Sequence, residues 1–289
     1  MADLSKKFSQ NAPGGLYVDS TCIDCETCRW MAPDTFKESS GHSIVYQQPE
    51  TEQQKIRAHQ ALISCPSGSI GSEDSESVKR AAKSFPSPLE EDVFHCGYHS
   101  EKSFGAASYF IRRSSGNILI DSPRFAAPLV RRIEEMGGIR TMILTHRDDI
   151  ADQKQFQEHF NCDRVMHRDD LGHPLRNVEI ELSGENPIEL ENDITILPVP
   201  GHTKGHIVIH FKKKFLFTGD HLAFWPPRSS LIAFRNACWY SWTEQTKSMR
   251  ILFGIEFEWV LPGHGFPHHS SNEEIRAQLE RLVERMETL

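Results

Sequence analysis

The sequence predicts an α/β protein in which two sheets are covered by helices, with a smaller cysteine-bearing domain in front. Strand and helix signals alternate from Val93 onward. Four of the seven cysteines fall into one pattern within residues 1–71. A polar stretch with two prolines, residues 72–90, lies between these parts and is typical of a linker around a short helix. We therefore predict domains at residues 1–71 and 91–289, joined by that linker.

Composition limits the possible partners. The chain has 289 residues, of which 38% are hydrophobic, enough for one large and one small domain. A net charge of -8 argues against nucleic-acid binding, which usually needs a basic face. No apolar run is long enough to span a bilayer, so a membrane is not expected as a partner. The first ten residues lack the apolar stretch of a secretory signal. We expect a cytoplasmic protein, or one of the plastid stroma if a transit peptide has been removed.

The front domain carries its cysteines at metal-binding spacing. The segment CIDCETC places Cys22, Cys25 and Cys28 at two-residue gaps, and Cys65 precedes a proline after a helix-like stretch. Three thiolates on one tight loop can hold three corners of a cubane iron–sulfur cluster, and the distant Cys-Pro supplies the fourth. Zinc is the alternative, but zinc sites usually divide their ligands into two pairs. The other three cysteines are scattered, as expected for small buried apolar residues.

Residues 16–70 resemble the single-cluster bacterial ferredoxins. The resemblance rests on VDSTCIDCETC, then APDTF, then SCPSGSI. It implies a small α+β ferredoxin-like domain with one [4Fe-4S] cluster bound by Cys22, Cys25, Cys28 and Cys65. The ligands alone leave open whether the cluster transfers electrons or only stabilises the domain.

The elements of the second domain follow in order. Two strands, residues 109–111 and 117–121, flank a Ser-Gly turn, and apolar residues at helical spacing predict a helix over residues 126–136. The strand TMILTH, a helix over residues 152–160 and the strand RVMH come next. Three strands then follow, ITILPVPG, HIVIHF and FLFTGD, with a lysine-rich hairpin turn between the last two. A helix over residues 242–253, the strand EWVLPGHG and an amphipathic helix over residues 273–286 complete the domain.

Five polar motifs each follow a predicted strand. They are Asp121 in LIDSP, His146 in LTHRDDIAD, His202 in PGHTKGH, Asp220 in FTGDH and His264 in LPGHG. A lone histidine after a strand is more often an ordinary polar residue, but five such motifs are hard to explain by chance. Imidazole and carboxylate groups on loops at strand ends are the ligands of a catalytic divalent metal.

Residues 93–265 resemble the metallo-β-lactamase superfamily through these motifs. The resemblance implies an αββα sandwich whose loops gather along one edge. It also implies roles for the residues of the motifs, with His146, His202 and His264 as metal ligands, Asp220 as a shared carboxylate and Asp121 as a structural residue near the site. Members of the family cleave lactams, thioesters and phosphodiesters, and some carry out redox chemistry.

One motif departs from the family pattern. The usual His-x-His-x-Asp-His is HRDDIADQ here, so Asp148 takes the place of the second histidine, and the Asp-His pair is displaced to Asp152 and Gln153. The second metal position therefore loses an imidazole. Asp148, Asp149 and Asp152 could each ligate, and hard oxygen ligands favour iron or manganese relative to zinc. The alternative is that one or two of these aspartates cap the helix that begins near Asp152.

These observations predict a metal-dependent enzyme with a small-molecule substrate. We expect one or two zinc, iron or manganese ions, held by His146, Asp148, Asp152, His202, Asp220 and His264. In a metallo-hydrolase, the first hypothesis, Asp148 or Asp152 would also act as the catalytic base.

Two other functions remain open. His146, His202 and Asp220 match the two-histidine, one-carboxylate set of non-haem iron enzymes, and they resemble the ligands of the persulfide dioxygenases of the same superfamily. The chain would then be a mononuclear-iron or di-iron oxidoreductase fed by the cluster, with a ferredoxin or a reductase as electron donor. The third hypothesis is a non-catalytic electron-relay protein. The aromatic stretch with Trp225, Trp239, Tyr240 and Trp242 could line a substrate pocket or pack against the terminal helix.

Overall fold

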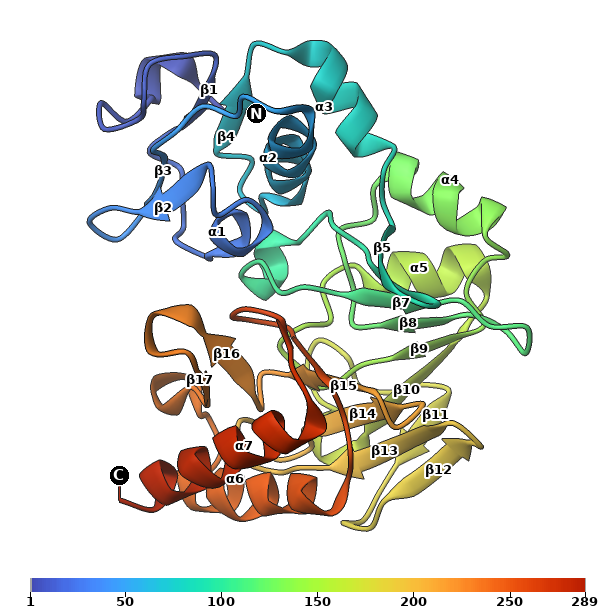
Figure 1. Cartoon of the computed structure of the whole chain (residues 1–289). Helices are drawn as coiled ribbons and strands as arrows, with labels where there is room; N and C mark the ends of the chain where they lie inside the picture. Colours follow the sequence, from blue (N-terminus) through green and yellow to red (C-terminus); the bar gives the residue numbers. More distant parts are fainter. Residues whose placement is uncertain (1, 289) are drawn as a thin grey trace. The chain divides into compact units, whose positions relative to one another are not determined.

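The computed structural model describes residues 2–288, and the chain forms two compact units (Figure 1). The first unit comprises residues 1–140 and 151–161, and the second comprises residues 141–150 and 162–289. Within residues 2–288, no helix is both long enough and apolar enough to cross a membrane. The predicted domain boundaries at residues 71 and 91 stay a prediction.

The first unit begins with the cysteine-bearing module. Its elements are a 3₁₀ turn (Leu4–Lys6), β1 (Leu16–Val18), α1 (Thr27–Met31), β2 (Phe36–Glu38), β3 (Ser43–Val45), α2 (Glu52–Ser64) and β4 (Ile70–Ser72). β1 pairs antiparallel with β4, and β2 with β3, so two small hairpin-like sheets flank the helices. Apolar residues from β1, β3 and α2 pack together with Cys28 and Cys65 in one small core.

Helix α2 delivers the last predicted cluster cysteine. Thr51 and Gln54 form a capping box at its start, which satisfies backbone amides that the helix leaves free. The helix ends at Ser64, and Cys65 occupies its C-cap directly before a proline, which cannot continue a helix. The sequence therefore fixes both ends of α2 and, with them, the position of Cys65.

The rest of the first unit is an antiparallel meander with helices. It contains α3 (Ser75–Ala82), β5 (Ser87–Glu90), β6 (Val93–His95), a 3₁₀ turn (Glu101–Ser103), β7 (Tyr109–Ile111), β8 (Ile118–Ile120), α4 (Ala127–Glu135) and α5 (Gln153–Phe160). Each strand from β5 to β8 pairs with the next one along the chain. The predicted strands around the Ser-Gly turn, the short helix α3 in the predicted linker and the two predicted helices α4 and α5 are confirmed.

The second unit contains a six-stranded sheet with the order β12-β13-β14-β15-β18-β19. The strands of this sheet are β12 (Ile188–Glu191), β13 (Ile194–Pro198), β14 (Ile207–Phe211), β15 (Phe215–Gly219), β18 (Trp259–Pro262) and β19 (His268–His269). β12 to β15 are antiparallel, while β15 and β18 run parallel. Parallel strands end at the same edge of a sheet, so the loops that follow β15 and β18 emerge side by side.

Three further strands of this unit, β9 (Thr141–Ile143), β10 (Asp163–His167) and β11 (Ile180–Leu182), pair in parallel. The remaining elements are β16 (Ala223–Trp225), β17 (Ser230–Ile232), α6 (Trp242–Met249), α7 (Asn272–Glu287) and four 3₁₀ turns (Arg168–Asp170, Pro226–Arg228, Arg235–Ala237 and Arg250–Gly254). The helix predicted over residues 242–253 therefore changes to a 3₁₀ turn at Arg250.

Helices α6 and α7 lie beside each other in Figure 1. The apolar stripe of α7, which includes Ile275, Leu279 and Leu282, packs with Val208 of β14 and Val260 of β18 in one core. The predicted core-facing stripe is therefore confirmed. This packing makes the sheet a rigid support for the loops at its strand ends.

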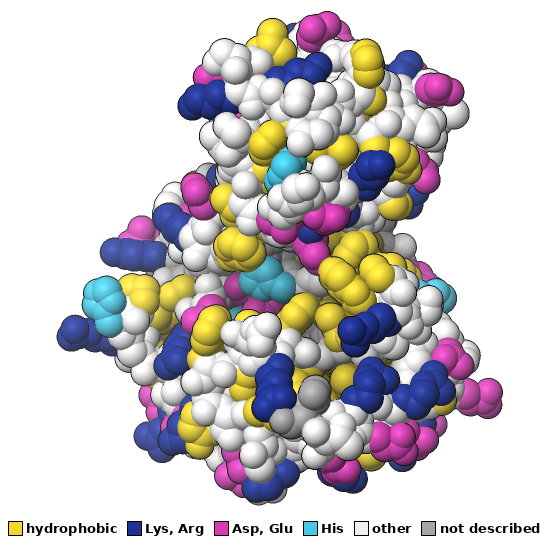
Figure 2. All heavy atoms as spheres, turned by 90° about the vertical axis from the view of Figure 1, so that its left-hand side faces the viewer, with side chains coloured by type: hydrophobic (Ala, Val, Ile, Leu, Met, Phe, Trp, Pro, Cys, Tyr) yellow, Lys and Arg dark blue, Asp and Glu magenta, His cyan; other side chains and the backbone are white. Residues whose placement is uncertain are grey.

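The surface carries charges of both signs. On the face shown in Figure 2, lysine and arginine side chains are interspersed with aspartate and glutamate, and apolar side chains lie between them. This pattern accords with the net charge of -8.

Candidate metal centres

The four predicted cluster cysteines line one small cavity in the first unit. The side chains around it are Val18, Cys22, Ile23, Cys25, Thr27, Cys28, Ser43, Cys65, Ser67, Ser69 and Ile70. Cys28 and Cys65 are buried, while Cys22 and Cys25 are half-buried. The amide of Ser69 donates a hydrogen bond to the sulfur of Cys65 at 3.3 Å. Thiol groups that converge in an apolar surround are the donor set that an iron–sulfur cluster requires.

The loop that carries the first three cysteines has an uncommon backbone. Asp24 and Glu26 both adopt positive φ, at 58° and 66°, a conformation that costs about 1–2 kcal/mol for a residue with a side chain. The largely buried Arg29 holds both residues, because its guanidinium lies 2.8 Å from the carboxylate of Asp24 and 3.0 Å from that of Glu26. A buried arginine thus stabilises the turn that brings the sulfurs together.

Burial shapes the chemistry of these thiols. Burial raises the pKa of Cys25 to about 11, and it raises the pKa of Cys28 as well. A thiolate in this cavity therefore needs a positively charged partner, which the iron of a cluster supplies when it is bound. The residues present fit the group. The assignment of the four cysteines as its ligands stays a prediction.

The second group of predicted ligands is assembled by loops of the second unit. His146, Asp148 and Asp149 follow β9, and His202 follows β13. Asp220 follows β15 and His264 follows β18, whose parallel ends adjoin. Residues far apart in the sequence therefore meet because their strands end at one edge.

Two imidazoles and several carboxylates converge where the loops after β9, β13 and β15 meet. The Nε2 atom of His202 lies 3.2 Å from Oδ2 of Asp148, and the Nε2 atoms of His146 and His202 each lie 3.6 Å from Oδ2 of Asp220. His146 Nε2 is 3.9 Å from a carboxylate oxygen of both Asp148 and Asp149.

In the described part of the chain, two residue sets bring ligand atoms within 4.8 Å of one another, and they share His146. One set is His146, Asp148 and His202, and the other is His146, Asp149 and Asp220.

The carboxylates are crowded in a way that favours a cation. Asp149 and Asp220 are both buried, yet their oxygens approach each other and His146. A Cβ atom on Gly263 would lie 2.6 Å from Oδ2 of Asp149 and 3.1 Å from Oδ1 of Asp220, so only glycine fits beside this pair. Buried like charges are costly unless a metal or another cation neutralises them. The donor set therefore fits a divalent metal.

His264 makes a different contact from the other two histidines. Its Nδ1 atom lies 2.8 Å from Oδ1 and 3.0 Å from Oδ2 of Asp220, and its amide donates to the same carboxylate at 3.2 Å. Burial alone would lower the pKa of His264, but the charges of Asp220 and Asp149 outweigh it and raise the pKa to about 9. Burial alone would likewise raise the pKa of Asp220, which His264 and His146 hold well below its ordinary value.

Asp170 joins two of the loops that carry predicted ligands, although no sequence motif marks it. This buried residue accepts hydrogen bonds from the amide of Arg147 at 3.1 Å, the hydroxyl of Thr203 at 2.5 Å and the amide of Gly205 at 2.7 Å. It therefore fixes the loop of His146 and the loop of His202 relative to each other. Its one sequence signal is its place three residues after the strand RVMH.

His206 contacts two of the predicted ligand residues, His146 and Asp220. Its ring stacks on that of His146 at 4.8 Å, and its Nε2 accepts a hydrogen bond from the amide of Asp220 at 3.1 Å. His146 in turn uses Nδ1 to contact the Thr145 hydroxyl at 2.9 Å, and its Nε2 faces the carboxylate of Asp220 at 3.6 Å. Gly219 adopts a φ of +47°, and a side chain there would collide with Thr145 and His206.

Asp152 and Asp121 belong to the first unit. One carboxylate oxygen of Asp152 accepts a hydrogen bond from Lys102 Nζ at 2.6 Å and the other accepts one from the amide of Phe125 at 2.9 Å. The side chain of Asp152 does not cap α5, so the capping alternative is wrong for this residue. Asp121 is buried with a φ of 55°. The predicted metal and catalytic roles of Asp152 stay predictions.

Two positions of the aromatic stretch differ in their surroundings, because Trp242 packs against the terminal helix and Trp239 is exposed. Trp242 donates from its indole to the carbonyl of Met286, so it packs against the terminal helix. The amides of Trp239 and Tyr240 instead donate to the carbonyl of His202, at 2.8 and 3.1 Å. The Trp239 ring is 60% exposed and lies 6.2 Å from the His202 ring. Trp239 therefore presents an exposed aromatic surface beside the predicted ligand His202.

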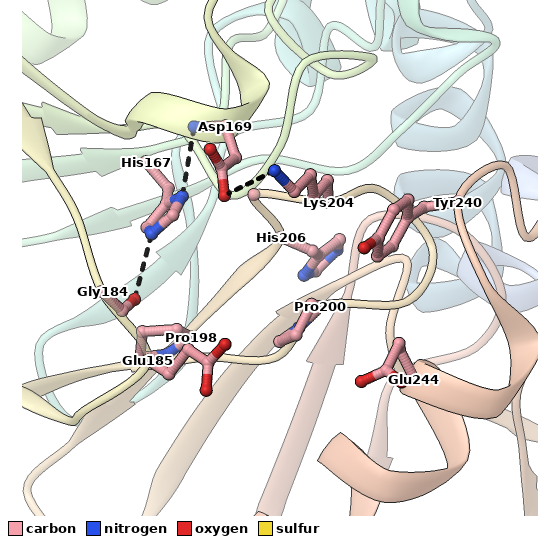
Figure 3. Close-up of a pocket in the computed structure, with 11 residues that line it drawn as sticks. His167, Asp169, Gly184, Glu185, Pro198, Pro200, Lys204, His206, Tyr240 and Glu244 are labelled. Atoms are coloured by element: carbon pink, nitrogen blue, oxygen red, sulfur yellow. Dashed lines mark hydrogen bonds and ion pairs between the residues drawn. The ribbon is translucent and has the colours of Figure 1, made fainter.

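The second unit contains a pocket of about 180 Å³ that His206 helps to line (Figure 3). Its lining residues are His167, Asp169, Gly184, Glu185, Pro198, Pro200, Lys204, Gly205, His206, Tyr240 and Glu244. Lys204 pairs with Asp169 at 3.5 Å, and the amide of Asp169 and the carbonyl of Gly184 both contact the His167 ring. The polar groups of His167, Asp169, Gly184 and Lys204 are thus engaged with one another.

Comparison with known proteins gives one match to the cysteine-bearing segment and further matches that cover larger shares of the chain. Residues 18–72 match the family of the 4Fe-4S single cluster domain of Ferredoxin I. The chain is 26% identical over 140 residues to YmaE of Bacillus subtilis, an alignment that covers 45% of this chain and 50% of the relative. It is 33% identical over 111 residues to the hydroxyacylglutathione hydrolase of Erwinia tasmaniensis, covering 37% of this chain and 43% of the relative. The chain thus spans half or less of the length of these relatives.

Solved structures of metallo-β-lactamases share the fold. The FIM-1 enzyme of Pseudomonas aeruginosa has a TM-score of 0.53 at 18% identity, covering 68% of this chain and 93% of that one. The enzyme of Hirschia baltica has a TM-score of 0.52 at 19% identity, covering 68% and 95%.

The chain therefore has the α/β sandwich of the metallo-β-lactamase fold, as predicted. It combines that fold with a single-cluster [4Fe-4S] domain of the ferredoxin type.

Proposed function

We propose that this protein is a metal-dependent hydrolase with one divalent metal and one [4Fe-4S] cluster. The metal ligands would be His146, His202, Asp148 and Asp220, and the cluster ligands would be the four cysteines of the front module. The observation that carries the proposal is the convergence of two imidazole Nε2 atoms and the oxygens of Asp148 and Asp220 at 3.2–3.9 Å. The chain supplies two histidines and two carboxylates on fixed loops.

One metal-binding position at this centre is better supported than two. Asp148 replaces the second histidine, and His264 is engaged with Asp220 through Nδ1. Asp149 marks a second possible position, which shares His146 and Asp220 with the first. We therefore favour one ion, zinc, iron or manganese, and keep His264 as a residue that orients Asp220.

The centre fits hydrolysis of an acyl bond. A divalent metal supplies Lewis acidity and lowers the pKa of water when it is bound. Asp148 is the most exposed of these carboxylates, with 40% of its side chain accessible, so it is placed to receive the proton that water loses as it attacks the carbonyl carbon. Its pKa lies below its ordinary value, because the hydrogen bond from His202 and the nearby His146 outweigh the effect of burial. Asp152 is the other candidate for this role.

The substrate class follows from the relatives and from the exposed indole. Several relatives are hydroxyacylglutathione hydrolases, so we propose a small acyl thioester or ester as substrate. Trp239, exposed beside His202, offers a face for the apolar part of such a molecule. In the reaction a C–O bond forms, the C–S bond breaks, and the thiol leaves with a proton.

The test is hydrolysis of an acyl-glutathione thioester by protein reconstituted with zinc under anaerobic conditions. We expect thiol release that is lost in Asp148→Asn and His202→Ala but kept in the exposed variant Lys154→Gln. Thiol release at the same rate in metal-stripped protein would contradict the proposal.

A second candidate is an oxidoreductase with a non-haem iron. His146, His202 and Asp220 provide two imidazoles and one carboxylate at 3.6 Å from each imidazole, the set that such enzymes use. The cluster would then take electrons from a ferredoxin or a reductase. Addition of dithionite distinguishes the candidates, because a change in the spectrum of the second metal on reduction favours the oxidoreductase. A silent metal with thioester turnover favours the hydrolase.

The cellular setting follows from the thiols. All seven cysteines are free, which fits a reducing compartment such as the cytoplasm or the plastid stroma. We also propose that the front domain ends near residue 71 and the fold domain begins near residue 91.

A further inference from the structure

A line of buried polar side chains leads away from Cys25 within the first unit. The sulfur of Cys25 lies 3.5 Å from the hydroxyl of Thr27, and that hydroxyl lies 3.1 Å from Nδ1 of His99. His99 Nδ1 also lies 2.7 Å from the carbonyl of Gly105, and its Nε2 lies 2.8 Å from Nε2 of His95. Thr27, His95 and His99 are all buried. The cluster loop is thus joined to the segment after β6 by hydrogen bonds.

The contacts fix where the ring protons lie. A carbonyl oxygen can only accept, so the short contact to Gly105 requires a proton on Nδ1 of His99. When the His99 ring is neutral, its Nε2 carries no proton and accepts from Nε2–H of His95. Burial, with the neighbouring His99 ring, lowers the pKa of His95 well below its ordinary value and keeps it neutral. One tautomer of each histidine satisfies all of these contacts.

The same contacts decide where the hydroxyl proton of Thr27 points. Its neighbours are His99 Nδ1, the Gly105 carbonyl at 3.4 Å and the Cys25 sulfur. Nδ1 carries a proton and cannot accept, whereas the Gly105 carbonyl has two lone pairs and can accept from both His99 and the hydroxyl. A cysteine bound to a cluster is a thiolate, which has no proton of its own and accepts. A charged sulfur is a stronger acceptor than a neutral carbonyl, so the hydroxyl donates to Cys25 when the cluster is bound.

Gly105 makes the close approach possible. A Cβ atom at this position would lie 3.0 Å from Cβ and 3.2 Å from Sγ of Cys25, and the residue has a φ of +90°. The Trp30 ring covers both histidines, at 5.0 Å from His95 and 6.2 Å from His99. The packing therefore holds the network against the loop that carries Cys25 and excludes competing water.

We propose that His99 is a positioning residue that raises the reduction potential of the cluster by directing the Thr27 hydroxyl onto the Cys25 sulfur. The proposal rests on Cys25 as a ligand of the proposed cluster. Reduction adds negative charge to the cluster and its thiolates, so a hydrogen bond to a ligand sulfur stabilises the reduced form. His95 contributes by fixing the tautomer of His99. The cluster would thereby be tuned by a histidine that lies outside the ferredoxin-like segment.

The test is the midpoint potential of the cluster in the full-length protein, followed by electron paramagnetic resonance during an anaerobic redox titration. Thr27→Val should lower the potential, and Thr27→Ser should restore it because the hydroxyl is kept. His99→Phe should also lower it, while His99→Asn keeps a donor for Gly105 and should restore much of it. Because both residues act through one hydrogen bond, the double variant should match Thr27→Val alone.

A spectroscopic readout separates hydrogen bonding from loosened packing. Resonance Raman bands of the iron–cysteine bonds should shift in D2O in the wild type, and one such shift should vanish in Thr27→Val. The matched control is His59→Phe, since His59 is a buried histidine of the same module whose nitrogens contact the Lys55 carbonyl and the Ser72 hydroxyl. If His99→Phe does not retain its cluster, His95→Phe replaces it, with a smaller shift in the same direction.

The outcomes are distinguishable. If the His99 and His95 variants keep full iron and sulfide content and an unchanged potential, this inference is overturned and the cluster assignment is unaffected. Shifts from Thr27→Val and His99→Phe that add independently would overturn it too. A wild-type chain without iron and sulfide for one cluster would contradict the cluster assignment itself, and this inference with it.

Discussion

The thiol cavity of the front module and the histidine–carboxylate centre are built in opposite ways. Three of the four cysteines lie within seven consecutive residues, and the fourth sits at the C-cap of the next long helix. The ligands of the other centre come from loops after β9, β13, β15 and β18, from His146 to His264. A local turn can hold the first set almost by itself, whereas the second needs the whole sheet.

The two sites also differ in what stabilises them. At the cluster loop, Arg29 binds the two residues whose backbone is least favourable, so the support is a neighbour in sequence. At the second centre, Asp170 contacts two loops that lie 23 and 35 residues away from it, and His206 contacts the backbone of Asp220, 14 residues away. The comparison teaches that a cysteine motif can be interpreted from spacing alone, while an assembled centre depends on residues that carry no motif.

The largest expected effect separates the two sites. Cys28→Ala removes a buried sulfur from the thiol cavity, so we expect loss of the cluster with retention of the metal at the second centre. Iron, labile sulfide and total metal per chain measure both. Cys162→Ala, a buried cysteine of the second unit, is the control and should keep the cluster. Loss of both metals in Cys28→Ala would break the comparison.

The next prediction asks how many ions the second centre holds. His202→Ala removes an Nε2 donor that contacts both Asp148 and Asp220, so metal affinity should fall by more than about 100-fold. Metal affinity should fall by less in His264→Ala, because the imidazole of His264 hydrogen-bonds the carboxylate of Asp220 at 2.8 Å and would act on the metal through it. Metal titrations followed by calorimetry give both affinities. Equal losses in the two variants would instead favour a two-metal centre with His264 as a ligand.

Asp170 tests whether the second centre depends on residues without a motif. Asp170→Asn weakens the hydrogen bonds that join the loops of His146 and His202, so we expect metal affinity and turnover to fall by about 10- to 100-fold. Asp169→Asn is the matched control, because its side chain pairs with the exposed Lys204 at 3.5 Å and does not join the two loops. Comparable effects from both substitutions would show that general charge, rather than the bridge between loops, matters.

The smallest expected effect concerns space beside the carboxylates. Gly263→Ala places a methyl group against Asp149 and Asp220, a strain of about 1–3 kcal/mol that should weaken metal binding by about tenfold or more. Gly254→Ala meets no atom within 4 Å and should leave binding unchanged. Competition with a chromogenic chelator measures both variants, and tighter binding in Gly263→Ala would refute the account of this glycine.

The sequence predicted the elements that have strong local signals. The apolar stripe of α7, the capped α2 and the strands before the polar motifs all form where they were expected. The β16–β17 hairpin within the aromatic stretch was not predicted, because its residues show neither a clear alternation nor a typical turn pair.

The site was predictable only in part, for a physical reason. His146, Asp148, His202 and Asp220 carry motifs, and the structure brings them together. Asp170 acts through contacts made in the folded chain, so no local pattern marks it, and Gly263 lies in the LPGHG motif without any sequence sign of its contact with the carboxylates. Asp152 was chosen for its carboxylate, yet its oxygens bind Lys102 and an amide, which a list of residue types does not reveal.

The measurement that tests the central claim most directly is metal and sulfide quantification on anaerobically purified wild type and Asp220→Ala. Asp220 contacts both imidazoles of the second centre and lies in the unit that does not contain the thiol cavity. Two chemically separate sites predict one cluster plus one further ion in the wild type, and loss of that ion with the cluster retained in the variant. Unchanged metal content in Asp220→Ala, or loss of the cluster along with the ion, would contradict this account.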